Sequence, residues 1–184
     1  IRDAIKSDGL KIDWVMASGD HLSPDILKDI RLHSPHTRIN VVYGLTELSG
    51  RYCILAGDEL NGNETTVGRP IDGFRIQATD EVGRPLPPGE IGEIWVAGDH
   101  KMKEYVNDPD ETAQSMDGEW FKTGDMGFMD EESLVTICGR KDDVFKQSGV
   151  KISTLLINDA LMAISIFTDA VAVPEEHPIL GHIP

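Results

Sequence analysis

The alternation of hydrophobic and polar positions changes three times along the chain, and the first pattern is that of a strand, a helix and a second strand. Residues 14–17 are a short apolar run that ends in the turn signal Ser18-Gly19-Asp20. A helix is expected to begin at Pro24, which follows a serine and precedes an acid, as at the start of many helices. Pro35 ends this helix. Residues 39–43 form the next apolar run. Two strands joined this closely by a helix predict a parallel, right-handed crossover unit.

The second pattern, from about residue 65 to 138, is that of short strands separated by turns. Residues 74–78 alternate apolar and polar side chains, as a half-buried strand does. Two further strands are expected at residues 91–96 and 134–138, with turns at 81–85 and 87–90. Short strands at this spacing predict a small barrel or sandwich.

The third pattern begins after Arg140 and indicates another small α+β unit. Apolar residues at helical spacing predict a helix within residues 155–167, and residues 170–173 are expected to form a strand. We therefore expect an α/β segment, then a small β-rich segment, then the start of a small α+β unit.

Composition narrows the function classes. The chain has 184 residues, of which 17 are Lys or Arg and 32 are Asp or Glu, and its net charge is −15. This acidity argues against nucleic acid or an anionic membrane surface as a partner, since both need clustered cations. No apolar run reaches the roughly 18–20 residues that a membrane span needs. Cys53 and Cys138 lack CxxC spacing, which argues against a disulfide scaffold or a zinc site and favours a cytoplasmic protein. Because the sequence opens without Met and stops abruptly, we expect a piece of a larger enzyme.

The first candidate sites are the loops that follow the two predicted parallel strands, Ser18-Gly19-Asp20 and Tyr43-Gly44-Leu45-Thr46-Glu47. In open α/β sheets ligands bind at this edge. The second loop offers an aromatic face, a glycine, a hydroxyl and a carboxylate, the set that a nucleotide with Mg²⁺ requires. The alternative is a polar strand-to-loop transition that binds nothing.

Two further candidates lie downstream. In Thr123-Gly124-Asp125 the carboxylate is suited to accept hydrogen bonds from ribose hydroxyls, although a simple β-turn is the alternative. Residues 140–151 form a basic island, which suggests a bound anion next to Gly149 or, alternatively, a solvated hairpin of mixed charge. The charged residues of this island are Arg140, Lys141, Asp142, Asp143, Lys146 and Lys151.

Taken in order, these motifs resemble the adenylate-forming superfamily of acyl-CoA synthetases, peptide-synthetase adenylation domains and luciferases. The resemblance rests on residues 43–47 and 123–125 and on the tract from 139 to 152. Lesser agreements are Val67-Gly68-Arg69-Pro70, residues 89–94, Tyr105, Pro109 and Thr112-Ala113. The resemblance implies an α/β subdomain segment at 1–64, a distorted β-barrel subdomain at 65–140 and the start of a small mobile C-terminal domain at 141–184.

The resemblance also implies a two-step reaction. A carboxylic acid attacks the α-phosphate of ATP, in the presence of Mg²⁺, to give an acyl-adenylate and pyrophosphate. The thiol of CoA, or of a carrier-protein pantetheine, then displaces AMP. Positioning and charge neutralisation would carry the first step.

Individual residues receive roles only through this resemblance. Tyr43 is similar to the adenine-stacking aromatic, with Gly44 beside it, and Thr46 to the hydroxyl that faces the phosphate. Glu47 resembles the Mg²⁺ carboxylate. The remaining implied roles are the ribose contacts (Asp125, Arg140), the hinge (Asp142), the face for the thioester step (Lys146, Gly149) and the adenine and acyl pocket loop (Ser18, Gly19, Asp20).

Departures from the family pattern affect the expected activity. The family's Gly/Ser/Thr-rich phosphate loop and its C-terminal catalytic lysine are not in these 184 residues, so we expect this chain alone not to form an adenylate. Two acids that usually follow the residue 146–152 motif are also missing, and Leu156 stands in a normally polar position.

Three functions remain open. The tract at 139–152 favours a CoA ligase, whereas residues 18–24 look more like an adenylation domain that loads a carrier protein. A non-catalytic module that binds a nucleotide or a partner is the third, and the intact Glu47, Asp125 and Arg140 count against it.

Overall fold

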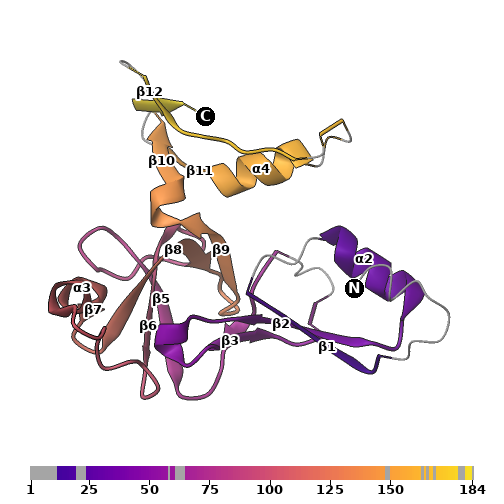
Figure 1. Cartoon of the computed structure of the whole chain (residues 1–184), viewed down its shortest axis with the longest axis horizontal. Helices are drawn as coiled ribbons and strands as arrows, with labels where there is room; N and C mark the ends of the chain where they lie inside the picture. The colour runs from indigo at the N-terminus through magenta and orange to yellow at the C-terminus, as the bar shows by residue number, and fades with distance from the viewer. Residues whose placement is uncertain are drawn as a thin grey trace.

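The computed structural model describes residues 12–19, 24–57, 59–60, 65–147, 150–162, 164, 166–167, 169–177 and 181–183. Three sheets follow one another along the chain (Figure 1). In the described part of the chain, no helix is both long and apolar enough to span a membrane.

The first sheet contains the predicted parallel unit. Strand β1 (Trp14–Ser18) pairs in parallel with β2 (Arg38–Tyr43), and helix α2 (Pro24–His33) connects them. Two short strands complete the sheet in the order β1-β2-β3-β4, with β3 at Cys53–Leu55 and β4 at Arg69–Pro70. Helix α2 lies over one face of this sheet because Leu27 and Ile30 are buried against Ile39. The crossover predicted from the pattern is therefore confirmed as a parallel pair with a helix between.

The second sheet is antiparallel and curls into a half-barrel (Figure 1). It holds five strands in the order β5-β6-β8-β7, with β9 paired to the other end of β8. The three strands predicted from alternation are present as β5 (Phe74–Thr79), β6 (Gly92–Gly98) and β9 (Val135–Arg140). The pattern missed helix α3 (Pro109–Ser115), the short β7 (Met116–Asp117) and the long central β8 (Trp120–Met129).

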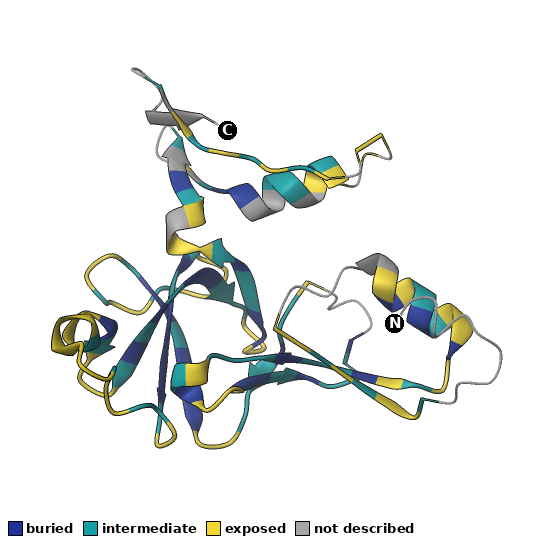
Figure 2. Cartoon of the chain, in the orientation of Figure 1, coloured by how far each residue is buried: buried dark blue, intermediate teal, exposed yellow. Residues whose placement is uncertain are grey.

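The two sheets share one hydrophobic core. Ile94 and Val96 of β6 and Val135 of β9 are fully buried, and they belong to the same cluster as Tyr52 and Cys53 of the first sheet. Figure 2 shows that buried residues concentrate along the strands where these two sheets meet. The core thus fixes the end of β2 against the face of the half-barrel.

The third sheet belongs to the C-terminal segment. After the 3₁₀ turn η2 (Lys141–Asp143), strands β10 (Val144–Gln147) and β11 (Val150–Ser153) form a hairpin, and helix α4 (Thr154–Met162) follows. Strands β12 (Glu175–His177) and β13 (Gly181–Ile183) complete the order β11-β10-β13-β12. The domain limits drawn from the resemblance stay a prediction.

Two expectations for this segment are wrong. The helix ends at Met162 rather than at 167, because the β-branched Ile164 and Ile166 that follow are exposed and have no face to pack against. Residues 170–173 are not a strand. The backbone N–H of Ala172 donates instead to the side chain of Asn158, at 2.6 Å.

We predict that two glycines of nearly identical backbone conformation differ sharply in how much stability is lost when each is replaced by alanine. Gly68 has φ +91° and Gly73 has φ +90°. A Cβ at Gly68 would lie 2.0 Å from the carbonyl of Ile54, whereas a Cβ at Gly73 meets nothing within 4 Å. Gly73→Ala should therefore lower the free energy of unfolding by only the conformational cost of about 1–2 kcal/mol. Gly68→Ala should lose a further ~1–3 kcal/mol through the clash, as measured by urea unfolding. Equal losses would contradict this close approach.

Candidate functional site

The candidate site begins where β2 ends. After Tyr43 the chain turns through Gly44 into a short 3₁₀ helix, η1 (Thr46–Leu48), and doubles back so closely that Gly44 cannot carry a side chain. A Cβ on Gly44 would lie 2.1 Å from the carbonyl oxygen of Gly50. The backbone N–H of Gly50 donates to the carbonyl of Leu45, at 2.8 Å, which closes the loop. The loop therefore holds Thr46 and Glu47 directly beside the end of the strand.

The second part of the site is a bulge in the middle of β8. The simple β-turn considered as the alternative at 123–125 does not form, because these residues continue the strand while the pairing with β6 shifts register. Gly124 adopts φ +71°, and a Cβ there would lie 2.9 Å from the guanidinium of Arg140. Thr123 donates its hydroxyl to the carbonyl of Ile94 and accepts from the N–H of Asp125, at 2.7 and 3.0 Å. The bulge turns Asp125 inward, where only 5% of it is exposed.

Three residues predicted from separate motifs meet at the Asp125 carboxylate. The Tyr43 hydroxyl donates to one oxygen, although the two residues are 82 positions apart in sequence. Arg140, which pairs with Asp125 across β8 and β9, donates from Nη1 to the other oxygen at 2.6 Å. The same nitrogen donates to the carbonyl of Thr123 at 3.0 Å. Since a buried charge needs a partner and hydrogen bonds, this arrangement stabilises the ionised carboxylate.

Tyr43 is backed by buried groups that resist ionisation. Its ring meets the ring of Tyr52 edge-on, with centroids 5.0 Å apart. Burial, followed by the effect of Tyr52 and the charge of Asp125, raises the pKa of the Tyr43 hydroxyl far above its usual value. Burial likewise raises the pKa of Tyr52 and of the Cys53 thiol. The hydroxyl of Tyr43 thus keeps its proton at any physiological pH and serves as a hydrogen-bond donor.

Glu47 forms the wall of the site opposite Asp125. The carbonyl oxygen of Glu47 accepts from the backbone N–H of Met102 at 2.7 Å, and its Oε1 accepts from the Tyr105 hydroxyl at 3.0 Å. Among the described residues, no group of three or more His, Cys, Asp and Glu side chains could hold a metal ion by itself. Mg²⁺ commonly binds through one or two carboxylates together with substrate phosphates, and Glu47 fits that mode as one such carboxylate.

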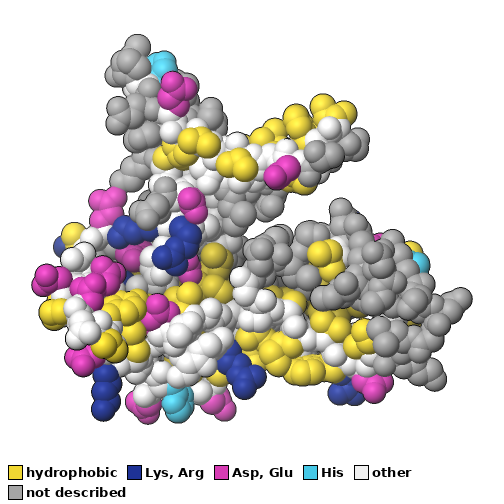
Figure 3. Space-filling model, viewed as in Figure 1, with side chains coloured by type: hydrophobic (Ala, Val, Ile, Leu, Met, Phe, Trp, Pro, Cys, Tyr) yellow, Lys and Arg dark blue, Asp and Glu magenta, His cyan; other side chains and the backbone are white. Residues whose placement is uncertain are grey.

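A pocket of about 620 Å³ lies beside these features, although Tyr43, Thr46 and Asp125 are not among the described residues that line it. Three cationic side chains line it, namely Lys122, Arg140 and Lys141, and Lys141 also pairs with Glu93 at 3.0 Å. Figure 3 shows basic side chains beside acidic ones where the half-barrel faces the C-terminal segment. The other lining residues are Leu45, Glu47, Tyr105, Glu111, Gln114, Ser115, Phe121, Thr123 and Gly124. Three cations share this pocket with the carboxylates of Glu47, Glu93 and Glu111, a set that suits a polyanion bound with a divalent cation.

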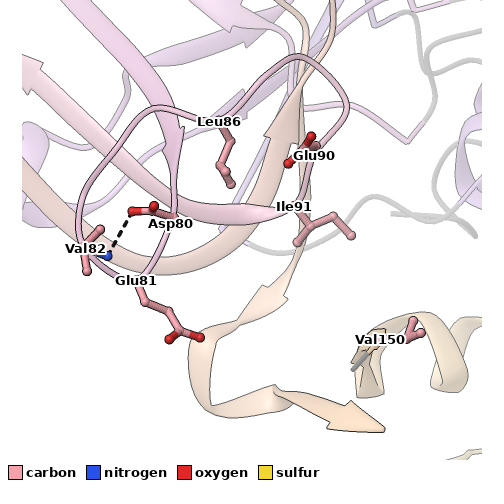
Figure 4. A pocket seen from close by; sticks show the side chains of 7 residues that line it. All are labelled: Asp80, Glu81, Val82, Leu86, Glu90, Ile91 and Val150. Carbon is pink, nitrogen blue, oxygen red and sulfur yellow. Dashed lines mark hydrogen bonds between the residues drawn. The ribbon is translucent and has the colours of Figure 1, made fainter. Parts of the chain in front are cut away.

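A second pocket, of about 650 Å³, has a different character (Figure 4). Asp80, Glu81 and Glu90 line it, together with Leu86 and Ile91 of the half-barrel, and the exposed Val150 of the C-terminal hairpin lies across from them. No Lys or Arg is among the described residues that line it. Its carboxylates would repel phosphate, so we place no nucleotide there.

Other predicted site residues lie outside this cluster. Ser18 pairs with Val42 at the same sheet edge, and both Ser18 and Gly19 are exposed and do not line the pocket of about 620 Å³. Asp142 falls in η2 and Lys146 in β10, by their backbone positions. Asp20 and Gly149 lie outside the described residues.

The sequence motifs assign no role to four of the pocket residues. Tyr105 is only a point of agreement with the family, and Lys141 is only part of the basic island. Glu93 belongs to the agreement with the family at residues 89–94, whereas Lys122 carries no motif signal of its own and only directly precedes the residue 123–125 motif.

The comparisons with known proteins agree with this geometry. The sequence profile described as "AMP-binding enzyme" matches residues 3–106, more than half of the chain. The chain belongs to the AMP-binding enzyme family. A 4-hydroxybenzoate–CoA/benzoate–CoA ligase of Rhodopseudomonas palustris is 37% identical over 111 residues, covering 60% of this chain and 21% of that protein. A 4-coumarate–CoA ligase-like protein of rice is 30% identical over 185 residues, covering 99% of this chain and 31% of that protein.

Solved structures add the fold. Unliganded O-succinylbenzoate coenzyme A synthetase of Bacillus subtilis superposes with a TM-score of 0.85 at 24% identity, over 93% of this AMP-binding chain and 37% of that structure. The resemblance drawn from the motifs is therefore confirmed at the level of family and fold. The chain spans about a third or less of the length of the bacterial and rice relatives.

The buried tyrosines and cysteine behind the site predict alkaline sensitivity. The pKa values of Tyr52 and Cys53 are raised by burial in the folded chain, so unfolding releases protons once the pH exceeds the ordinary values of 10.0 and 9.0. The free energy of unfolding should fall by up to about 1.4 kcal/mol per pH unit for Cys53 above about pH 9, and by a similar further slope for Tyr52 above about pH 10. Urea unfolding at a series of pH values measures this, and Cys53→Ala should fall less steeply between pH 9 and 10. A flat profile to pH 11 would contradict the burial of these groups.

Proposed function

We propose that this chain forms the ribose-binding and metal-binding part of an ATP-dependent carboxylic acid–CoA ligase. The observation that carries the proposal is the meeting of Tyr43, Arg140 and Asp125 at one buried carboxylate, beside a pocket that holds Glu47 and several cations. Two of the relatives are CoA ligases by name. The proposed site would thus bind the nucleotide along the line from β2 to the bulge in β8.

In this proposal each residue acts on one part of the nucleotide. Asp125 accepts hydrogen bonds from the ribose hydroxyls, and Arg140 donates to that carboxylate while reaching the same sugar. The ring of Tyr43 stacks on adenine above the closely folded Gly44. Thr46 donates its hydroxyl to the phosphate. Glu47 would hold Mg²⁺, which supplies charge neutralisation on the phosphates when it is bound.

The reaction would proceed in two displacements. The carboxylate of the acid attacks the α-phosphorus of ATP, a P–O bond forms, and the bond to pyrophosphate breaks. The thiol of CoA then attacks the acyl carbonyl, losing its proton, and AMP leaves. Residues 18–20 would line the adenine and acyl pocket.

Between the two displacements the C-terminal segment would rotate. Asp142 would be the hinge, because η2 links Arg140 of the site directly to strand β10. Lys146 would act as a catalytic residue of the C-terminal segment, separate from the family's C-terminal catalytic lysine, which is not in these 184 residues. It would lie with Gly149 on the face presented for the thioester step.

CoA is the proposed acceptor, rather than a carrier protein. The tract at 139–152 and the CoA ligases among the relatives support it. The acidic composition and the two unpaired cysteines support a cytoplasmic setting. The carboxylic acid substrate is an aryl or alkyl carboxylate. Because the named relatives act on aryl acids by name, aryl acids are the first to test.

Carboxylate-dependent exchange of pyrophosphate into ATP tests the proposal. It is measured on the longest natural polypeptide that contains these 184 residues, across a panel that starts with benzoate and cinnamate derivatives, followed by addition of CoA. We expect exchange with at least one acid and CoA-dependent release of AMP. Exchange without turnover of CoA would move the acceptor to a carrier protein, and no exchange with any acid would overturn the ligase.

AMP binding to the chain itself tests the ribose contact. The variant Asp125→Ala with Arg140→Ala removes both partners, so that neither charge is left unpaired. Calorimetry should show AMP binding weakened by at least about tenfold, as expected for a lost charged hydrogen bond. Removal of both ribose hydroxyls, in 2′,3′-dideoxy-AMP, should weaken binding to the unsubstituted chain but not to the variant. Asp117→Ala, at an exposed acid of β7, is the matched control, and unchanged AMP affinity in the double variant would contradict the site.

A further inference from the structure

The loop after β6 is fixed against Glu47 by contacts at its backbone. The N–H of Met102 donates to the carbonyl of Glu47 at 2.7 Å, and the hydroxyl of Ser49 donates to the carbonyl of His100 at 2.8 Å. The loop therefore follows η1 closely, and it places Tyr105 next to the Glu47 side chain.

The backbone of Tyr105 is in turn fixed by the start of helix α3. Its N–H donates to the Thr112 hydroxyl at 2.9 Å, and that hydroxyl donates to the carbonyl of Asp108 at 2.7 Å. Asp108 caps the helix by accepting from the N–H of Glu111 at 3.0 Å, and Pro109 occupies its first turn. A capped helix thus sets where the Tyr105 side chain points.

From this position the Tyr105 hydroxyl donates to Oε1 of Glu47 at 3.0 Å. Both residues line the pocket of about 620 Å³ that also contains Arg140. A carboxylate has two oxygens, so Tyr105 occupies one of them and fixes the direction of the other.

We propose that Tyr105 is a positioning residue that orients the Glu47 carboxylate for the divalent cation bound with the nucleotide. This inference rests on the proposed function, which gives Glu47 its cation. Partners that hydrogen-bond to a metal-binding carboxylate commonly change metal affinity by 10–100-fold when they are removed.

A simpler role for Tyr105 is to order the loop. In that case any variant that loosens the loop from η1 should weaken the site in the same way, and binding of AMP without metal should suffer as well. A positioning role instead confines the effect to the divalent cation.

The two roles are separated by measuring how tightly Mn²⁺ binds in the presence of ATP. Binding is monitored as the loss of the free Mn²⁺ signal in electron paramagnetic resonance. The longest natural polypeptide that contains this chain is compared with Tyr105→Phe, which keeps the ring and removes only the hydroxyl. We expect Mn²⁺ to bind about tenfold more weakly to Tyr105→Phe, with metal-free AMP affinity unchanged. The control Ser49→Ala removes a side-chain hydrogen bond between the end of η1 and the loop, and it should leave both affinities within about twofold.

The comparison that decides between the two roles is made in a protein that already carries Glu47→Gln. Tyr105→Phe should add nothing to Glu47→Gln if the hydroxyl acts through the carboxylate, since coupled residues are not additive. The proposal would be overturned if Tyr105→Phe left the Mn²⁺ affinity unchanged, or if it lowered that affinity as much in the Glu47→Gln background as in the unsubstituted protein. It would also be overturned if Ser49→Ala lowered the Mn²⁺ affinity equally, or if the protein bound no Mn²⁺ beyond that held by ATP itself. Acid-dependent exchange judges the ligase separately, so weakened Mn²⁺ binding without exchange would refute the ligase and leave Tyr105 in its role.

Discussion

The carboxylate of Asp125 is the interaction on which the site depends. A buried charge is costly unless it is paired and hydrogen-bonded, and here Tyr43 and Arg140 supply both needs. Tyr43 comes from the parallel sheet, whereas Asp125 and Arg140 come from neighbouring strands of the half-barrel. One carboxylate therefore joins two sheets at the point where the nucleotide is proposed to bind, and their shared core keeps that point rigid (Figure 2).

Two close backbone approaches give the site its shape. The loop at Gly44 leaves no room for a Cβ, which would lie 2.1 Å from the carbonyl oxygen of Gly50, and in the bulge a Cβ at Gly124 would lie 2.9 Å from the Arg140 guanidinium. The first brings Glu47 beside β2, and the second turns Asp125 inward. The contact from Tyr105 to Glu47 then closes the opposite wall. Beside the Asp125 cluster, the pocket thus holds Glu47 together with the cations Lys122, Arg140 and Lys141, which come from different elements.

The sequence predicts those parts of the molecule that depend on local pattern. The strand–helix–strand unit follows from apolar runs and from helix signals at Pro24 and Pro35, and the strands at β5, β6 and β9 follow from alternation. The pattern predicts a turn where the structure has a bulge at Gly124, because a strand that shifts register is visible only in its pairing with β6. It also predicts helix beyond Met162, because apolar spacing does not reveal whether a packing face exists. The roles of the site residues rest on the family resemblance, and the structure adds the contacts that join them.

Photolabelling with 8-azido-AMP, followed by peptide mapping, tests most directly whether the end of β2 and the bulge in β8 form a single nucleotide site. The account predicts that the label falls on residues 43–47 and around Asp125, that unlabelled AMP competes for both positions, and that both vanish together when Asp125 and Arg140 are replaced by alanine. Labelling elsewhere on the chain, or labelling of one of the two segments that AMP does not displace, would contradict it.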